Sequence, residues 1–347
     1  MCRERAWPGS GVRGMKWTEI SRLERSMPVS KDDVVAAYRL ILGREPTDQE
    51  AAEWLHLGSV AELRKAFLAS GEFRDGFQKI VSQPAAAPGR LALDCAPISV
   101  EWTTSVGSER KLVQYVTATW TALGKVEPHW SVLSSPDFKS DRIGKTAEVF
   151  FGSGHGDAAR IAATLARHGL TPDNFPRMVE YGCGVGRVTP FLAGMFKEVV
   201  AIDISQSHLD LARQVVAGKG CRNATLTLAR APEFGMRAAF DLWFSHIVLQ
   251  HNPPPVMALV LQRMFEMLAP GGVAIFQVPT HVPGYRFNVA EYLAAPKDGS
   301  IEVHCLPQEA VFQIADAAGC VPLEVREDDA MPPPWLSDVF VFRKKPF

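Results

Sequence analysis

The chain has 347 residues, of which 47% are hydrophobic and 22% are charged, so it can bury a large core and is predicted to be globular. Its formal net charge of -1 lacks the basic excess of proteins that neutralise many phosphates, which argues against nucleic acid as a partner. No run approaches the roughly 20 apolar residues that a membrane span needs, and the six scattered cysteines form no zinc-type spacing, so we expect a cytoplasmic protein with reduced thiols and no metal.

The first 29 residues show no hydrophobic periodicity and no apolar stretch typical of a secretion signal. We predict a mobile extension over residues 1–29, and Met15 or Met27 could be the true start.

Residues 30–80 are predicted to form a small helical module. Three pairs of residues have the spacing of a capping box at a helix start, namely Ser30 with Asp33, Thr47 with Glu50, and Ser59 with Glu62. Gly43 is expected to end the first helix, and Phe77 is an apolar residue of the last.

Two stretches of this module, "YRLILGREPTDQEAAEWL" and "FLASGEFRDGF", carry a Leu-Gly-Arg-x-Pro sequence and a Ser-x-Glu-Phe-like sequence. They resemble the phycobilisome-linker-like helical module found beside bacterial enzymes of surface-polysaccharide synthesis. The resemblance implies that the module could bind a partner protein or a glycan, and a plain packing or oligomerisation role is the alternative.

A linker is predicted at residues 81–95, where "SQPAAAPGR" has no core pattern. Residues 96–175 are expected to form a cap of helices and loops that leads into the catalytic domain. Helical spacing covers residues 112–123 and 157–169, and the aromatic-rich loop "KVEPHWSVLSSPDF" lies between them.

From residue 176 to 347, strands and helices alternate as in an α/β protein with a doubly wound, mostly parallel, Rossmann-like sheet. The predicted strands are "RMVEYG", "EVVAIDI", "ATLTLA", "FDLWFSH" and "GGVAIFQVP", with helices that begin near Arg187, Gln206 and Pro255. A helix at 308–318 and the strands "PLEVRE" and "DVFVFRKK" are expected to close the chain as an antiparallel hairpin.

The first of these strands runs into "VEYGCGVGR", in which Gly182, Gly184 and Gly186 alternate with other residues. Glycines would allow a sharp turn and the close approach of a ligand to the backbone. The dinucleotide fingerprint G-x-G-x-x-G would need a third glycine at position 187, where this chain has Arg187, and a Walker lysine is absent. Asp203 ends the second strand, where a carboxylate can accept hydrogen bonds from a ribose.

This combination resembles the class I S-adenosylmethionine-dependent methyltransferases. The similarity also covers "VAIDIS", "FDLWFSHIVLQH" and "LAPGGVAIF", in the family's order. The resemblance implies S-adenosyl-L-methionine as cofactor, with eight contacting residues: Glu180 at its amino group, Gly182, Gly184 and Gly186 along its methionine part, Asp203 at the ribose, Ile204 on the adenine, and Ser245 and His246 beside the sulfonium. Where the family often has an acidic residue for the adenine, this chain has Arg230 and Ala231, with Glu233 nearby.

Methyl transfer to a hydroxyl requires a base, and histidine suits that task near neutral pH. His246 and His251 are the predicted catalytic residues, ahead of His281 and His304. The segment "NPPP" lacks the aromatic residue of the Asn-Pro-Pro motif found in methyltransferases that act on nitrogen.

Two flanking regions are expected to shape an acceptor site. Trp130, Phe138 and Arg142 precede the sheet and could cover the cofactor. An insertion at 280–306 carries Tyr285, Arg286, Asn288 and Tyr292, which suit a glycan among other acceptors.

The sequence therefore predicts a methyltransferase that O-methylates a sugar, a nucleotide sugar or a surface polysaccharide. A non-catalytic cofactor-binding scaffold of a glycan-synthesis complex is the alternative, and a nicotinamide-dependent oxidoreductase is a third hypothesis that the arginine at position 187 disfavours.

Overall fold

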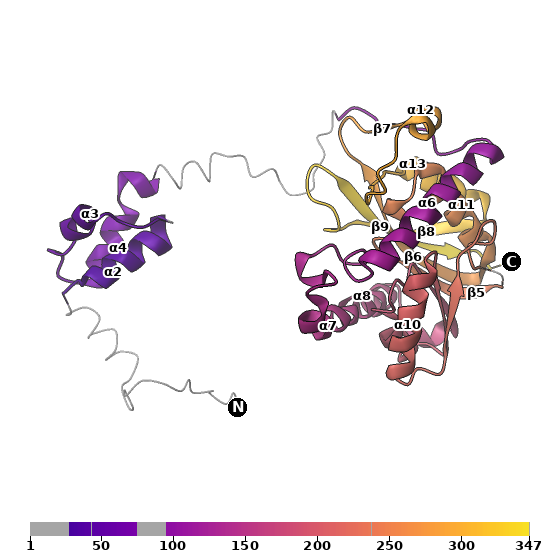
Figure 1. The fold of residues 1–347 in the computed structure, drawn as a ribbon, viewed down its shortest axis with the longest axis horizontal. Coiled ribbons are helices and arrows are strands. Elements are labelled where there is room, and N and C mark those ends of the chain that lie inside the picture. Colours follow the sequence, from indigo (N-terminus) through magenta and orange to yellow (C-terminus); the bar gives the residue numbers. More distant parts are fainter. Residues whose placement is uncertain (1–27, 43, 75–94, 237, 347) are drawn as a thin grey trace. The chain divides into compact units, whose positions relative to one another are not determined.

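The computed structural model describes residues 28–42, 44–74, 95–236 and 238–346, and it divides into two compact units, one within residues 1–88 and one within 89–347 (Figure 1). The predicted extension lies outside the described residues apart from its last two, and so does the predicted linker apart from Cys95. Gly43 and Phe77 also lie outside them.

The first unit consists of short helices around a small core. They are α2 (Lys31–Ala37), which continues as the π-helix η1 (Tyr38–Leu42), then α3 (Asp48–Glu53) and α4 (Val60–Leu68). Val34, Leu63 and Phe67 are at most 1% exposed, and the edge of the Phe67 ring packs against Tyr38. This unit therefore buries apolar surface of its own.

Two of the three predicted capping boxes are confirmed. Ser30 caps α2 with Asp33, and Thr47 caps α3 with Glu50, with both reciprocal bonds in place. The third prediction is half wrong: the Ser59 side chain caps α4, but Glu62 accepts a hydrogen bond from the Gly58 amide instead of the Ser59 amide.

The second unit is built on a seven-stranded sheet with the order β4-β3-β2-β5-β6-β9-β8. The strands are β2 (Arg177–Tyr181), β3 (Glu198–Asp203), β4 (Ala224–Leu228), β5 (Phe240–Ser245), β6 (Leu268–His281), β8 (Cys320–Glu327) and β9 (Leu336–Lys344). The first five strands in the sheet order are parallel, and β9 runs antiparallel to both β6 and β8. The predicted Rossmann-like sheet with a C-terminal antiparallel hairpin is confirmed.

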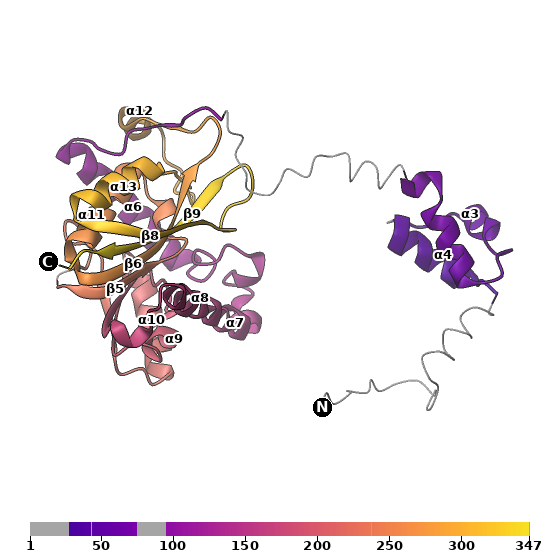
Figure 2. The ribbon, with the colours of Figure 1, turned by 180° about the vertical axis from the view of Figure 1, so that it is seen from behind.

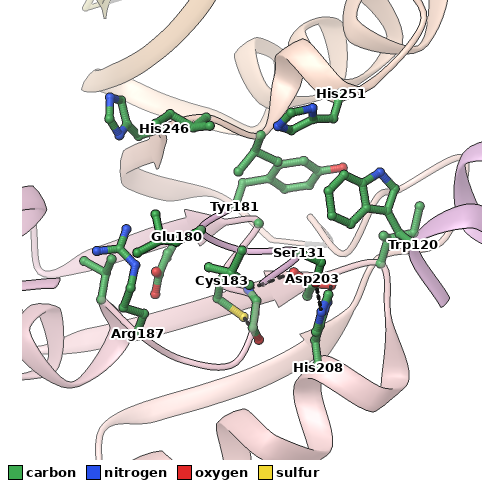
Figure 3. Close-up of a pocket in the computed structure, with 18 of the residues that line it drawn as sticks. Trp120, Ser131, Glu180, Tyr181, Cys183, Arg187, Asp203, His208, His246 and His251 are labelled. Atoms are coloured by element: carbon green, nitrogen blue, oxygen red, sulfur yellow. Dashed lines mark hydrogen bonds and ion pairs between the residues drawn. The ribbon is translucent and has the colours of Figure 1, made fainter. Parts of the chain in front are cut away.

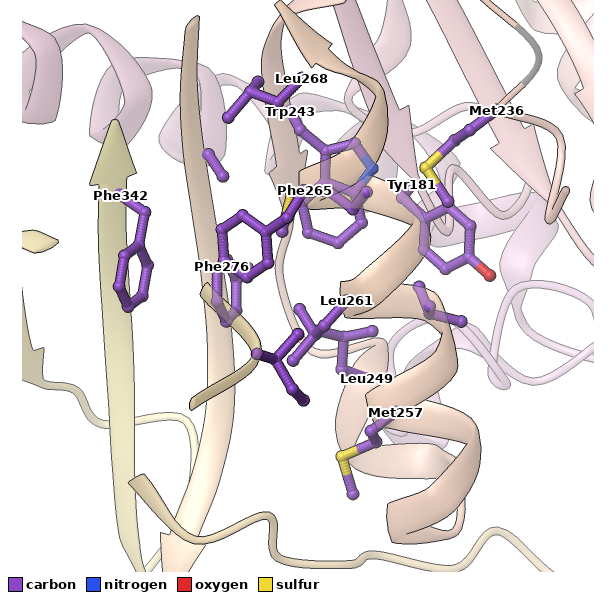
Figure 4. Close-up of a cluster of buried hydrophobic side chains, with 14 of the residues drawn as sticks. Tyr181, Met236, Trp243, Leu249, Met257, Leu261, Phe265, Leu268, Phe276 and Phe342 are labelled. Atoms are coloured by element: carbon purple, nitrogen blue, oxygen red, sulfur yellow. The ribbon is translucent and has the colours of Figure 1, made fainter. Parts of the chain in front are cut away.

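Helices cover both faces of this sheet (Figures 1 and 2). Helices α11 (Pro254–Met267) and α13 (Gln308–Ala317) pack on one face, where Trp243, Phe265 and Phe276 form the centre of the largest apolar cluster (Figure 4). The opposite face carries α8 (Gly154–Arg167), α9 (Thr189–Ala193) and α10 (Gln206–Gly218). Because both faces are covered, the central strands are apolar almost throughout, as parallel strands usually are.

The region before the sheet contains more structure than the sequence predicted. Helix α6 (Val106–Val126) is longer than its predicted core at 112–123, and α7 (Ile143–Gly152) was not predicted. In the insertion, β7 (Arg286–Phe287) pairs in parallel with β1 (Ser99–Val100), and α12 (Val289–Ala294) follows. The insertion is thus tied to the segment that precedes α6.

No helix within the described part of the chain is long and apolar enough to cross a membrane.

Candidate functional site

The turn after β2 depends on backbone conformations that favour glycine. Gly182, Gly184 and Gly186 have φ angles of +82°, +53° and +80°. A β-carbon on Gly182 would collide with Val248, and one on Gly184 would collide with Val132. Gly182 and Gly184 thus make room for side chains of the chain itself, and whether they also make room for a ligand stays a prediction.

A pocket opens at the carboxyl ends of β2, β3 and β5, where the order of strands in the sheet reverses (Figure 3). Its empty volume is about 970 Å³ when the part open to solvent is counted. The lining comes from the turn after β2, the ends of β3 and β5, helices α6, α8 and α10, and the segments at 131–133 and 246–252.

The structure brings most of the predicted site residues to this pocket. Those that line it are Glu180, Gly182, Gly184, Asp203, Ile204, His246 and His251. Gly186 and Ser245 do not line it: a β-carbon at Gly186 would lie 3.1 Å from Cα of Ala212 in α10, and Ser245 is 1% exposed.

Several residues that sequence reasoning considered lie elsewhere. Arg230, Ala231 and Glu233 do not line the pocket. The aromatic loop reaches the pocket through Ser131, Val132 and Leu133 rather than through Trp130, Phe138 or Arg142.

Asp203 is fixed by the backbone around it. Its Oδ2 accepts a hydrogen bond from the Gly184 amide at 2.8 Å, and its Oδ1 accepts one from the Ser205 amide at 2.8 Å. His208 Nδ1 lies 3.4 Å from Oδ1, and the other ring nitrogen of His208 bonds to Ser131. Since a carboxylate has about four acceptor positions, Asp203 retains capacity for hydroxyl donors in the pocket.

Glu180 is buried at the end of β2. Its Oε2 accepts a hydrogen bond from the Thr189 hydroxyl at 2.6 Å. Burial raises the pKa of Glu180 to about 8, despite the opposing effect of the bond from Thr189. The pocket wall therefore contains a carboxyl group whose ionised form would be stabilised by an added cation.

A second buried carboxylate, Asp157 of α8, was not predicted. Arg187 Nη2 donates to its Oδ2 at 2.6 Å, and His246 Nδ1 lies 3.3 Å from its Oδ1. Burial opposes ionisation of Asp157, but His246 and Arg187 outweigh it and lower its pKa to about 2. The sequence gives no reason to single out Asp157 as a site residue, because it occupies the first turn of a helix, where an acidic residue is common.

The backbone around His246 is held in an uncommon conformation. Ile247 has a φ of +56°, which is rare for a β-branched residue, and its amide donates to the Gln277 side chain. The His246 ring stacks on Phe244. These contacts and the Asp157 carboxylate together direct the imidazole to the rim of the pocket (Figure 3).

His251 lies across the pocket from His246, next to Trp120 of α6 (Figure 3). Its Nδ1 bonds to the Glu302 carbonyl at 2.9 Å, so Nδ1 carries the proton, and its Nε2 accepts a hydrogen bond from the Gln250 side-chain amide at 3.3 Å. Burial lowers the pKa of His251 to about 4, and the ring is therefore neutral at physiological pH.

The residues of the pocket fit the predicted cofactor. The carboxyl groups of Asp157, Glu180 and Asp203 suit a ligand that carries an ammonium and a sulfonium, and Ile204 supplies an apolar surface for a base. His208 Nδ1 is buried without a hydrogen-bond partner, so this nitrogen can form a hydrogen bond with a ligand beside Asp203. No cluster suited to a metal ion occurs among the residues that the structure describes.

Part of the second unit matches a known protein family. Residues 178–272 match the family model described as "Methyltransferase domain". This match covers the turn after β2 and the ends of β3 and β5, and it supports S-adenosylmethionine as the cofactor of the domain.

Two curated relatives are trans-aconitate 2-methyltransferases. The protein of Methylobacterium radiotolerans is 34% identical over 140 residues, which cover 39% of this chain and 50% of the relative. The protein of Deinococcus radiodurans is 30% identical over 124 residues, which cover 35% and 46%. The chain thus spans about half the length of the curated relatives it matches.

Solved structures with lower similarity include the magnesium protoporphyrin IX methyltransferase of Synechocystis PCC 6803 with bound SAH, at 16% identity and a TM-score of 0.48. That comparison covers 67% of this chain and 100% of the other. The N-methyltransferase NodS from Bradyrhizobium japonicum WM9 is 18% identical, with a TM-score of 0.44 and coverages of 65% and 98%.

Proposed function

We propose that this chain is an S-adenosylmethionine-dependent methyltransferase that transfers the methyl group to a hydroxyl oxygen. The observation that carries the proposal is the pocket itself, in which Glu180 and Asp203 end adjacent parallel strands and two histidines face the same space. When bound, the cofactor supplies a methyl group on a sulfonium, which is already a good leaving group.

The residues of the chain have separate tasks in this proposal. Asp203 accepts the ribose hydroxyls, Glu180 faces the amino group of the cofactor, and Ile204 packs against the adenine. Alignment of the acceptor oxygen with the methyl carbon supplies most of the rate, because the reaction needs proximity more than acid–base chemistry.

His246 is our first candidate for the base that removes the hydroxyl proton. The Asp157 carboxylate lies beside Nδ1 of His246, so Nε2 is the ring nitrogen that is available to accept a proton. His251 is neutral, but a pKa of about 4 means that it would retain an abstracted proton poorly. Its Nε2 also accepts a hydrogen bond from Gln250, so we assign His251 a role in shaping the pocket wall.

For the acceptor we propose a sugar, a nucleotide sugar or a growing surface polysaccharide, supported by the resemblance of the first unit to modules found beside such enzymes. A carboxylate is the second candidate, because both curated relatives are trans-aconitate methyltransferases. A carboxylate has no proton that must be removed before it is methylated. The presence of histidines in the pocket therefore favours a hydroxyl acceptor.

The first test is calorimetric titration of the full chain with S-adenosylmethionine, S-adenosylhomocysteine and NAD. We expect binding of the first two only. Asp203→Asn should weaken this binding roughly 10- to 100-fold, because a hydrogen bond to a charged group contributes about 1.5 to 3 kcal/mol. Asp210→Asn, an exposed change in α10, is the matched control. NAD binding alone would instead support the oxidoreductase.

The second test measures transfer of a labelled methyl group to sugars, nucleotide sugars and trans-aconitate. On a hydroxyl acceptor, His246→Asn should reduce kcat by about 100-fold or more if it is the base. Equal loss on trans-aconitate would contradict that role, because a carboxylate has no proton to remove. Cofactor binding without transfer to any acceptor would favour the scaffold.

A further inference from the structure

A second, much smaller cavity lies beside the cofactor pocket. The two share Trp120 and His251 as a common wall. The other residues of the second cavity come from α6, from α12 and from the end of the insertion, and they include Tyr115, Thr119, Tyr292, Ser300 and Glu302.

Glu302 is held in the wall of this cavity by hydrogen bonds. The Tyr292 hydroxyl donates to its Oε2 at 2.6 Å, and the Tyr115 hydroxyl donates to its Oε1 at 3.2 Å. His304 Nε2 lies 2.9 Å from Oε2, while Tyr285 bonds to the other ring nitrogen of His304. These bonds fix the orientation of the Glu302 carboxylate.

The Glu302 carboxylate is ionised at neutral pH. Burial opposes ionisation, but hydrogen bonds from His304 and Tyr292 outweigh it and lower the pKa of Glu302 to about 2. The site therefore combines a fixed negative charge with two phenol rings whose centroids are 6.1 Å apart.

The chain places one of its own cations over these rings. Lys297 Nζ lies 3.0 Å from the centroid of the Tyr292 ring and 5.1 Å from that of Tyr115. Its electrostatic interaction with Glu302 is attractive. Lys297 is nevertheless exposed, in a stretch without regular structure between α12 and Glu302, so its side chain can leave without unpacking a core.

We propose that Tyr115, Tyr292 and Glu302 form an acceptor subsite at the wall of this cavity, and that it selects an acceptor with an ammonium group, which replaces Lys297 over the face of the Tyr292 ring. Aromatic faces beside a carboxylate bind organic cations through cation–π and Coulomb attraction. An acceptor that carries both a hydroxyl and an ammonium, as an amino sugar does, meets His251 at the shared wall. The acceptor role rests on the proposed methyl transfer, but the cation site does not.

The experiment measures binding of tetramethylammonium and of uncharged tert-butanol to the full chain by saturation-transfer NMR. Lys297→Ala should bind tetramethylammonium roughly tenfold more tightly than the wild type, because the competing cation is removed. In the Lys297→Ala background, Tyr292→Leu and Glu302→Gln should each reverse this gain. Arg286→Ala removes an exposed cation of the same insertion that pairs with Glu291, and it should change nothing.

Equal binding of the two probes to Lys297→Ala, or a gain that survives both reversing substitutions, would overturn the cation site. Titration of each variant with S-adenosylhomocysteine separates the two proposals. Normal binding of S-adenosylhomocysteine with no cation preference would refute only the subsite. A cation preference in a chain that does not bind S-adenosylhomocysteine would refute the methyltransferase proposal.

Discussion

Three carboxyl groups line the pocket, and each has a different set of partners. Asp203 accepts backbone amides, Asp157 pairs with two guanidinium groups, and Glu180 has one neutral donor. Because the partners differ, the groups respond differently to a bound cation and to pH. Two predictions at the scale of the residue follow from that contrast.

Glu180 should make cofactor binding depend on pH. Its pKa of about 8 in the free protein means that it is mostly protonated at pH 7, whereas an ammonium placed beside it favours the ionised form. Binding therefore releases a proton, and affinity should rise by up to about tenfold per pH unit between roughly pH 5.5 and 7.5. Titrations of S-adenosylhomocysteine in buffers of different ionisation enthalpy measure the proton release.

Glu180→Gln should remove both the proton release and the pH dependence, since glutamine does not titrate. A variant that keeps the slope of the wild type would show that another group is responsible.

Arg187 should matter more for stability than an exposed arginine does. Its side chain is 12% exposed and that of Asp157 is 6% exposed, so Arg187→Met removes the closest cation of a buried carboxylate and leaves Arg160, whose side chain is 60% exposed, as its guanidinium partner. We expect the free energy of unfolding to fall by about 3 kcal/mol, measured by urea denaturation. The control is Arg213→Met, whose ion pair with Asp210 is more than half exposed and should contribute about 1 kcal/mol or less. Similar losses in both variants would contradict the buried pair.

At the scale of the element, the turn after β2 is shaped by its neighbours as much as by its own glycines. Val132 from the loop before α7 and Val248 from the loop after β5 occupy the space that β-carbons at Gly184 and Gly182 would take. The turn, the loop and the strand end therefore form one packed assembly.

Gly184→Ala should lower the free energy of unfolding by roughly 2 to 4 kcal/mol, the sum of a left-handed backbone and a collision with Val132. In a Val132→Ala background the same change should cost only about 1 to 2 kcal/mol, because the backbone cost alone remains. Gly218→Ala, at a helix position with open space around it, is the control. If Gly184→Ala lowers the free energy of unfolding equally in both backgrounds, a collision with Val132 is not the cause of the loss.

At the scale of the whole molecule, the chain consists of two units with separate cores. Every residue that lines the cofactor pocket lies between Trp120 and Asn252, within the second unit. The first unit has a core of its own around Phe67.

Removal of residues 1–88 should therefore leave the affinity for S-adenosylhomocysteine within about twofold of that of the full chain, as expected for a site contained in one domain. Calorimetry of the two proteins side by side measures this. A loss of binding in a truncated protein whose circular dichroism shows a folded sheet would show that the first unit contributes to the site.

The sheet was predictable from local patterns. Apolar runs that end in Glu180, Asp203 or Ser245 indicated parallel strands, and the turn residues between them set the order of the elements. Capping at Ser30 and Thr47 was equally local, because each box involves residues three apart. Gly58 as the partner of Glu62 was not predictable, since either amide lies within reach of the carboxylate.

The sequence by itself determined the Rossmann-like sheet, the glycine turn and the polar residues at the strand ends, because periodicity and short spacings encode them. Only the tertiary structure decided that Asp157 holds His246, that Val132 covers Gly184, and that Lys297 lies over Tyr115 and Tyr292. Each of these contacts joins segments whose separation in the chain carries no fixed period. Their meeting depends on how helices and insertions pack against the sheet, which no local pattern specifies.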